Sequence, residues 1–369
     1  MAETHADGRE HTVDTHDGQP IGPVTALAAG RWAGRPVFAS GGADGAVRFW
    51  DTATRQPAGP ALTAHTGEVD FVAFAGPDRD LLVTGGDDEV LRWSPGDGAP
   101  HAEPVVRSGS VIAYGMTELD GSAVVSVGTR DGWVRLYDVA TGSPRGELYA
   151  GQDVHLLEGA DIGVLDGRLV ALTVVHDRAV PTSAMLPIAT VWDVASGKPL
   201  HDEPWRVPEE TATACRLVTV DGRLIAVTGI DTTAQYDVED EDDFPYQSEF
   251  FYETVLHFRL ADVARDEELN YCTVGAPGHA TVARSARGPV VLVALDSSEV
   301  VALDPHLGDK PGESPEFCYT WHGAPVTGVA TAEVNGRTIV ASGDRGGSLR
   351  FWDLDAPDPD RTHTMLHQY

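Results

Sequence analysis

A short strand–turn–strand pattern at both ends of the chain constrains the fold most strongly. Residues 38–59 (FASGGADGAVRFWDTATRQPAG) comprise an apolar strand end, a glycine-rich turn, an alternating strand that closes on Trp50-Asp51, and a second turn. Residues 341–353 (ASGDRGGSLRFWD) repeat this pattern almost letter for letter. A pattern that recurs in this way predicts a repeat architecture in which each copy is one supersecondary unit.

Weaker copies of the pattern fill the space between the two ends. Aromatic or leucine residues followed by Asp close the units at roughly 43 to 55 residues per unit, apart from one wider gap at the fifth unit; these pairs are Trp50-Asp51, Tyr137-Asp138, Trp192-Asp193, Leu303-Asp304 and Trp352-Asp353. Asp-Gly or Asn-Gly dipeptides, which supply the positive φ angles of a tight hairpin, precede the second strand of several units. Alternating strands bounded by glycine are half-buried. Four antiparallel strands at this period predict an all-β fold, a seven-bladed β-propeller of four-stranded antiparallel blades.

These motifs resemble those of the WD-repeat (WD40-type) β-propeller family across residues 21–354. The resemblance implies a buried His, Ser/Thr, Asp and Trp network in each blade, here termed a brace. The residues that match it are Ser40, Asp44 and Trp50 in the first blade, His65, Thr84, Trp93 and either Asp87 or Asp88 in the second, Asp131 in the third, Trp192 in the fourth, and His322, Ser342 and Trp352 in the seventh. The first blade has no histidine at the expected place, and Gly346 stands where the seventh-blade Asp is expected. Blades five and six carry Ala261 and Leu303 in place of Trp.

The expected organisation is a polar tail followed by one propeller domain. Residues 1–20 lack apolar periodicity and predict a flexible tail with unordered surface histidines, among them His5, His11 and His16. Residues 21–369 form the propeller, with blades at roughly 21–63, 64–106, 107–150, 151–205, 206–272, 273–318 and 319–369. The outer strand that closes the ring comes either from residues 361–366 (RTHTML) or from residues 11–15 (HTVDT). The first is favoured, because outer strands follow the Trp-Asp pair in the other units.

The composition limits the possible partners. A formal net charge of −31 repels phosphate backbones and anionic lipid, which argues against nucleic-acid and membrane-surface roles and favours basic proteins. No apolar run approaches the roughly 20 residues that span a bilayer, and the N-terminus does not resemble a secretory signal, so we expect a cytoplasmic monomer. The three widely spaced cysteines (Cys215, Cys272, Cys318) predict buried small residues, and no cofactor is expected. Only two of the 26 basic residues are lysines, a bias that indicates a high-GC, bacterial genome.

Two insertions interrupt the pattern between the second and third strands of neighbouring blades. They are residues 176–187 (HDRAVPTSAMLP) in the fourth blade and residues 230–253 in the fifth. The family resemblance places such loops on the face with the entrance to the central channel. The predicted binding residues are His176, Asp177 and Met185 in the first insertion, and Asp240, Glu241, Asp242, Asp243, Phe244, Tyr246, Phe250, Phe251 and Tyr252 in the second. Aromatic side chains among carboxylates suit a basic partner; the alternative is an acidic loop whose aromatic residues pack on the blade.

A second candidate site lies at the channel mouth, where register brings polar residues towards the axis. Glu68, Asp70, Asp153, His155, Glu210 and His279 could hold a divalent cation there, or could be ordinary channel-lining groups around water.

The sequence leaves three hypotheses about function open. The family resemblance implies a non-enzymatic protein-interaction scaffold, and the chain contains no phosphate-binding loop or nucleophile elbow. The alternative is a metal-dependent propeller hydrolase or lyase acting at the channel mouth. A third possibility is a regulator of a signalling ATPase or kinase.

Overall fold

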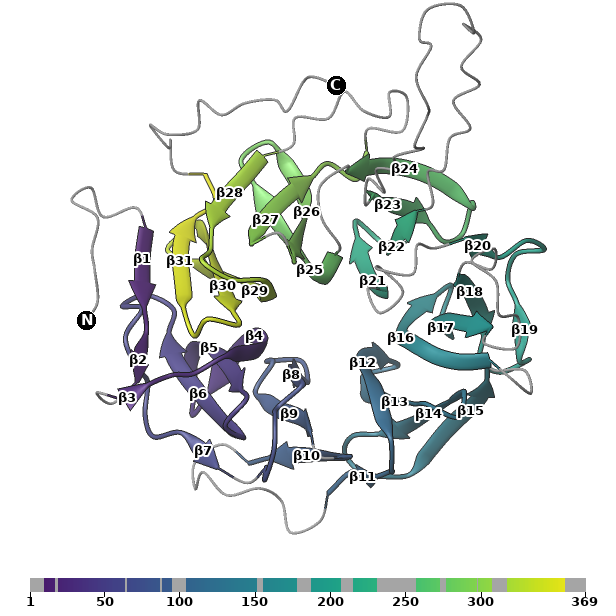
Figure 1. Ribbon diagram of the computed structural model, residues 1–369, viewed down its shortest axis with the longest axis horizontal. Coiled ribbons are helices and arrows are strands. Elements are labelled where there is room, and N and C mark those ends of the chain that lie inside the picture. Colours follow the sequence, from purple (N-terminus) through teal and green to yellow (C-terminus); the bar gives the residue numbers. More distant parts are fainter. Residues whose placement is uncertain are drawn as a thin grey trace, which may run out of the picture.

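Seven antiparallel sheets form a ring around a central axis, which confirms the predicted all-β, seven-bladed propeller (Figure 1). The computed structural model describes residues 10–16, 19–63, 65–86, 88–94, 104–150, 155–177, 187–206, 215–230, 257–272, 277–296, 298–306 and 317–355. Within these ranges no helix has the length and apolarity to cross a membrane.

Each blade consists of four strands that run outwards from the axis in chain order. The first three blades are β4 (Val24–Trp32), β5 (Arg35–Gly42), β6 (Ala46–Asp51) and β7 (Leu62–Thr63); β8 (Phe71–Ala75), β9 (Leu81–Gly86), β10 (Glu89–Trp93) and β11 (Val106–Arg107); and β12 (Val111–Leu119), β13 (Ser122–Thr129), β14 (Trp133–Asp138) and β15 (Pro144–Tyr149). Blade 4 is β16 (His155–Leu165), β17 (Arg168–Asp177), β18 (Ile188–Asp193), β19 (Lys198–Pro199) and β20 (Trp205–Arg206), with β19 and β20 both pairing β18.

Blades 5 and 6 follow the same order, and blade 7 takes its outer strand from the start of the chain. They are β21 (Cys215–Val220), β22 (Arg223–Ile230), β23 (His257–Asp262) and β24 (Glu267–Cys272); β25 (Pro277–Ser285), β26 (Gly288–Leu295), β27 (Glu299–Leu303) and β28 (Phe317–Trp321); and β29 (Val326–Val334), β30 (Arg337–Asp344), β31 (Leu349–Asp353) and β1 (Glu10–Val13). Two of the approximate predicted blade boundaries, 205/206 and 318/319, fall inside β20 and β28.

Local sequence accounts for the strands and for the hairpins between the first and second strands. In β14 and β18 buried and half-buried residues alternate, as expected for strands packed on one face. Asp120-Gly121, Asp166-Gly167, Asp221-Gly222 and Asn335-Gly336 have positive φ at both residues, as a tight two-residue hairpin turn requires. These hairpins lie at one end of the ring, here called the hairpin face. The innermost strands begin at the other end, the entry face, where second strands also connect to third strands.

The hydrophobic core lies between the blades. Leu27 and Phe38 of blade 1 share one buried cluster with Ile339 and Phe351 of blade 7, and the Phe38 and Phe351 rings lie 5.6 Å apart. Comparable clusters join blade 1 to blade 2 and blade 4 to blade 5. Each sheet therefore depends on its neighbours for burial, as expected of repeat proteins.

The N-terminal strand closes the ring. β1 pairs antiparallel with β31, from Glu10 opposite Trp352 to Val13 opposite Leu349, and Val13 is buried. β2 (Thr15–His16) and β3 (Gln19–Pro20) then form a small hairpin before β4. The prediction of a flexible tail over residues 1–20 is thus wrong for residues 10–16 and 19–20. The preference for residues 361–366, which lie outside the described residues, is also wrong, because β1 occupies the outer position of blade 7.

Candidate functional site

Buried or partly buried hydrogen bonds of the brace occur in four blades. In blade 2 the Thr84 hydroxyl lies 2.7 Å from His65 Nε2 and accepts a hydrogen bond of 2.8 Å from Trp93 Nε1. The Trp50 and Trp192 indoles donate to Ser40 (3.0 Å) and Thr173 (2.8 Å). In blade 7, His322 lies between Ser342 Oγ (2.6 Å from Nε2) and Asp344 Oδ2 (2.7 Å from Nδ1). Because these groups link strand to strand, or a loop to a strand, inside the protein, they act as structural groups.

The seventh-blade carboxylate is not at the position that the sequence pattern assigned. Gly346 stands at the expected place, but Asp344, two residues earlier, contacts His322. A Cβ on Gly346 would lie 3.2 Å from Asp344 Oδ1, so the glycine leaves room for this carboxylate. The Trp352 indole nitrogen is buried and has no hydrogen-bond partner among the described residues.

The first blade obtains its histidine from the N-terminal segment. His16, expected to be an unordered surface residue, is buried, and its ring lies edge-on to Trp50 at 5.1 Å. The β2–β3 hairpin between His16 and β4 lengthens the spacing, which is why the sequence pattern missed it. Asp44 bonds to Arg48 Nη1 (3.0 Å) and Ala46 N (3.2 Å) instead of a histidine.

Two of the remaining brace aspartates accept hydrogen bonds from groups other than a histidine, and the third lies outside the described residues. Asp131 accepts a hydrogen bond from Thr129 Oγ1. Asp88 Oδ1 accepts one of 2.8 Å from the N–H of Val111 on the next blade. Asp87 lies outside the described residues.

The aspartates that close the third strands cap the turns of the hairpin face. Asp51 Oδ1 accepts hydrogen bonds from the Ala53 and Thr54 N–H groups, and the bond from Thr54 holds the pKa of Asp51 below its usual range. Asp193 and Asp262 accept equivalent bonds from residues two to three positions ahead. The Trp-Asp signature is therefore a turn motif and not a catalytic one.

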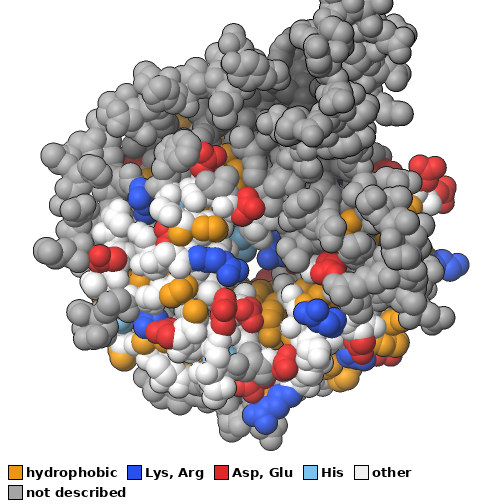
Figure 2. All heavy atoms as spheres, viewed as in Figure 1, with side chains coloured by type: hydrophobic (Ala, Val, Ile, Leu, Met, Phe, Trp, Pro, Cys, Tyr) orange, Lys and Arg blue, Asp and Glu red, His pale blue; other side chains and the backbone are white. Residues whose placement is uncertain are grey.

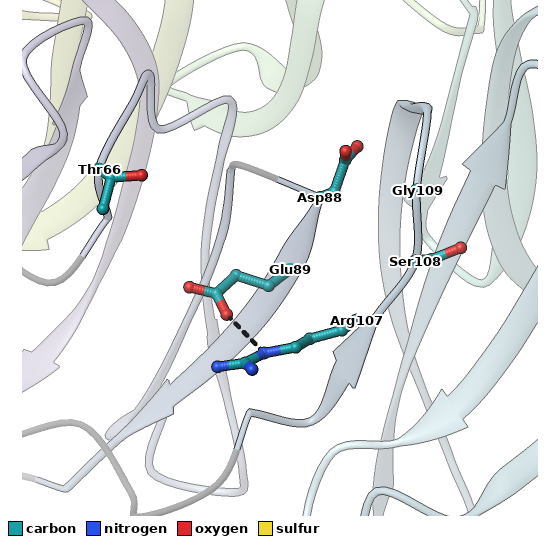
Figure 3. Close-up of a pocket in the computed structure, with 6 residues that line it drawn as sticks. All are labelled: Thr66, Asp88, Glu89, Arg107, Ser108 and Gly109. Atoms are coloured by element: carbon teal, nitrogen blue, oxygen red, sulfur yellow. Dashed lines mark hydrogen bonds and ion pairs between the residues drawn. The ribbon is translucent and has the colours of Figure 1, made fainter.

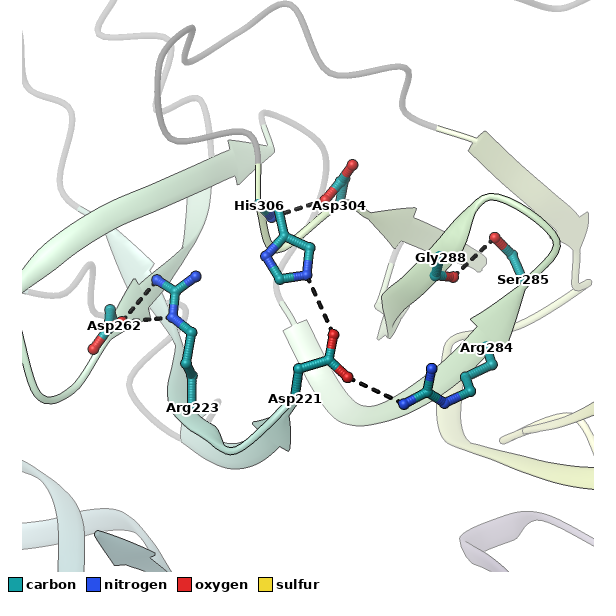
Figure 4. Close-up of polar contacts among 8 residues, drawn as sticks. All are labelled: Asp221, Arg223, Asp262, Arg284, Ser285, Gly288, Asp304 and His306. Carbon is teal, nitrogen blue, oxygen red and sulfur yellow. Dashed lines mark hydrogen bonds and ion pairs between the residues drawn. The ribbon is translucent and has the colours of Figure 1, made fainter. Parts of the chain in front are cut away.

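The hairpin face also carries ion pairs that join blades 5 and 6 (Figure 4). Asp221, in the blade 5 hairpin, lies 3.1 Å from Arg284 and 3.6 Å from His306 of blade 6. Arg223 forms a 2.7 Å ion pair with Asp262 of its own blade. These charges neutralise one another, so this cluster leaves no charge of one sign for a ligand.

The predicted binding residues fall mainly outside the described residues, which applies to Met185 and to Asp240 through Tyr252. His176 and Asp177 end β17, where their backbones pair with Leu156 and His155. Val175 pairs with Ile188 and Ile230 pairs with His257, so both insertions leave the ring between second and third strands. The two interrupted blades are neighbours in the ring (Figure 1), and both interruptions occur between second and third strands, at the entry face.

The predicted metal-binding residues are not brought together within the described part of the chain. Glu68 and Asp70 are exposed ahead of β8, and His155 begins β16. Asp153 and Glu210 lie outside the described residues. His279 in β25 accepts a 3.4 Å hydrogen bond from Val329 N. Among the described residues, no three His, Cys, Asp or Glu side chains are placed to hold a metal ion.

Three polar residues, Asp161, Arg216 and His279, lie on the innermost strands of blades 4, 5 and 6, around the axis. Of these, only His279 was identified from the sequence. Asp161 in β16 accepts 2.8 Å hydrogen bonds from Ile162 N and, across the blade boundary, from Leu217 N. Burial raises the pKa of Asp161 to about 6, against the opposing effect of the Arg216 charge. Burial, with the Arg216 charge, lowers the pKa of His279 to about 3. The available signal was a charged residue within an apolar strand, in LLEGADIGVL and CRLVTV.

Two other features of the described residues, a surface pocket and a buried thiol, offer less to a ligand. A shallow pocket on the entry face is lined by Thr66, Asp88, Glu89, Arg107, Ser108 and Gly109 (Figure 3). Arg107 and Glu89 form a 3.1 Å ion pair across it, so its charges are already matched. Cys215 is buried with a free thiol, and burial raises its pKa to about 12, which makes it unreactive.

Comparison with known proteins gives one family. The family described as "WD domain, G-beta repeat" matches residues 9–51 and 313–353. Each match spans the outer strand of one blade and the first three strands of the next, and the two meet where β1 pairs β31. A search of curated proteins gave no significant match. These two matches, together with the ring of seven antiparallel blades, support a WD-repeat β-propeller.

Proposed function

We propose that this protein is a non-enzymatic scaffold that binds a protein or peptide on its entry face, over blades 4 and 5. Propellers of this family are commonly protein-interaction scaffolds. The observation that carries the proposal is the shared position of the two insertions, which leave neighbouring blades at the same end of the ring. A rigid ring that presents long loops from adjacent blades offers one continuous contact area.

The composition of the second insertion supports a basic partner. Residues 230–253 contain the carboxylate run 239–243 and six aromatic residues, but no Lys or Arg. Aromatic side chains provide most of the binding energy of protein interfaces, while surrounding charges select the partner and speed association. We therefore propose a partner segment that is rich in Lys or Arg.

The test compares partner recovery from a lysate of the source cell by three forms of the full chain. These are the wild type, a variant with residues 238–251 replaced by a short Gly-Ser linker, and a variant with Asp240, Asp242 and Asp243 changed to Asn. A partner recovered by the wild type is expected to be lost with the linker variant and weakened with the Asn variant, more so at low salt. Circular dichroism melts of all three forms control for folding. Equal recovery of every partner by the wild type and a folded linker variant would overturn the proposal.

A further inference from the structure

We propose that Arg216 and His279 form a carboxylate-binding site on the axis of the ring. This site is separate from the proposed scaffold surface, and neither proposal depends on the other. Its ligand is a carboxylate group, carried by a small organic acid or by an acidic side chain of a bound peptide.

The position of Arg216 follows from the free edge of an innermost strand. β21 pairs with β22 on one side, so its other edge faces the axis. Leu217 N–H on that edge donates to Asp161 Oδ2, and Cys215 C=O, two residues away, accepts a 2.7 Å hydrogen bond from Arg216 Nη1. Alternate residues of an antiparallel strand point their N–H and C=O groups the same way, so this bond holds the guanidinium at the axis.

No carboxylate in the described part of the chain forms an ion pair with Arg216. The charge of Arg216 acts on Asp161, but the two oxygens of Asp161 already accept main-chain N–H groups, and no ion pair within 4.0 Å joins it to Arg216. Arg216 is only partly buried. A guanidinium has five N–H donors, and the bond to Cys215 uses one of them.

His279 adds a neutral donor from the next blade. Its Nδ1 accepts the hydrogen bond from Val329 N, which places the ring proton on Nε2. Burial and the Arg216 charge disfavour the imidazolium form, so this tautomer persists at neutral pH, and the pKa of His279 lies near 3. The residue as a whole is half-buried. Figure 2 shows basic, acidic and histidine side chains around the hollow at the centre of the face that it displays.

Arg216 and His279 lie on the innermost strands of neighbouring blades, and the Arg216 charge acts on His279, so their two kinds of donor favour a planar anion. The guanidinium fork matches the two oxygens of a carboxylate, and a neutral N–H can add a further hydrogen bond. A cation is disfavoured there because Arg216 would repel it. In a chain of net charge −31, local donors of this kind are needed to hold any anion.

The test measures thermal stability and calorimetric binding with two probes, sodium succinate and a triglutamate peptide, against sodium chloride at equal ionic strength. The full chain is compared with Arg216→Gln, Arg216→Lys and His279→Gln. Arg107→Gln is the matched control, because Arg107 is an exposed arginine paired with Glu89 on the outer rim. We expect at least one probe to raise the melting temperature of the wild type and of Arg107→Gln. Binding should weaken at least tenfold in Arg216→Gln and several-fold in the other two variants.

The outcomes separate the two sources of the carboxylate. Binding of succinate assigns the site to a small acid, and binding of triglutamate alone assigns it to a peptide side chain. The Lys variant keeps the charge without the fork, so it tests the geometry even if Arg216→Gln does not fold. The proposal is overturned if neither probe binds more tightly than chloride, or if the folded Arg216 variants bind as the wild type does.

Discussion

Burial and hydrogen bonding have opposite effects on the pKa of the Asp344 carboxylate. Burial alone would raise the pKa of Asp344, but hydrogen bonds from His322 and from Ser348 N outweigh it and hold the pKa below its usual range. An ionised carboxylate only accepts hydrogen bonds, so His322 Nδ1 donates to it. The loop ahead of β29 is thereby tied to both ends of the turn that connects β30 to β31.

Removal of this histidine should destabilise the ring. We expect His322→Ala to lower the free energy of unfolding by about 2–4 kcal/mol, because Ser342 and Asp344 both lose a buried partner. Urea denaturation measures the effect. His306→Ala is the control, since that histidine is largely exposed and should cost less than about 0.5 kcal/mol. Equal losses for the two variants would show that the blade 7 brace does not contribute as described.

The contribution of Asp161 to folding stability depends on pH in the opposite sense to that of an ordinary capping aspartate. Its pKa is raised from 3.8 to about 6, so between those values the folded chain holds a proton that the unfolded chain has released. The contribution of Asp161 to stability therefore falls as pH rises through this window. Asp161→Asn does not titrate.

The stability advantage of the wild type over Asp161→Asn should therefore shrink between pH 4 and pH 7, by up to about 3 kcal/mol. Urea unfolding of both proteins at several pH values measures this. Asp51→Asn is the control of opposite sign, because the pKa of Asp51 is lowered and its contribution is lost as pH falls. A pH-independent difference for Asp161→Asn would contradict the assignment.

At the scale of elements, blade 5 shows how a blade keeps its packing without the Trp of the motif. Ala261 occupies that position, and the Thr228 hydroxyl is buried with no hydrogen-bond partner among the described residues. Trp205, from β20 of blade 4, packs in the same buried cluster as Ala261 and donates a 2.8 Å hydrogen bond to Asp266 of blade 5. The guanidinium of Arg259 lies 4.5 Å from the centre of the Trp205 ring. Trp205 of blade 4 thus provides the indole that packs beside blade 5, where the motif tryptophan is replaced by Ala261.

The other element that decides the architecture is β1, which joins the first residues of the ring to its last blade. Deletion of residues 1–13 should lower the melting temperature strongly and cause aggregation, because it exposes the edge of β31 and removes Val13 from its cluster. Deletion of residues 361–369 should have little effect, because the outer position of blade 7 is already occupied. Differential scanning calorimetry of both deletions measures the contrast. A larger loss for the C-terminal deletion would mean that β1 does not close the ring.

At the scale of the whole molecule, the charge is far from balanced. The chain has 57 Asp and Glu residues against 26 Lys and Arg residues. Many acidic groups are neutralised locally, as Asp262 is by Arg223, but the sum still disfavours the compact state through repulsion.

Salt should therefore stabilise the protein. We expect the melting temperature to rise by a few degrees when sodium chloride increases from 10 to 150 mM, because the screening length falls from about 30 Å to about 8 Å. Potassium fluoride at the same ionic strength is the control for specific ion binding. A melting temperature that stays constant or falls would show that self-repulsion is not a significant term.

The sequence by itself determined the number of blades, most of their strands and the hairpins between them. These features rest on local signals: alternation with period two, Asp-Gly or Asn-Gly turns with positive φ, and aspartates that cap the turn two or three residues ahead. Of the candidate sites, it placed His279 on an innermost strand and the two insertions in neighbouring blades.

Only the tertiary structure decided which terminus closes the ring, which aspartate contacts His322, and that Asp161, Arg216 and His279 share the axis. In each case the partner atom lies far away in sequence or depends on a turn whose length varies. β1 meets β31 across nearly the whole chain, and Asp161 meets Leu217 on another blade. Closure of the ring brings such pairs together, and closure depends on the packing of all seven blades at once, which no local pattern encodes.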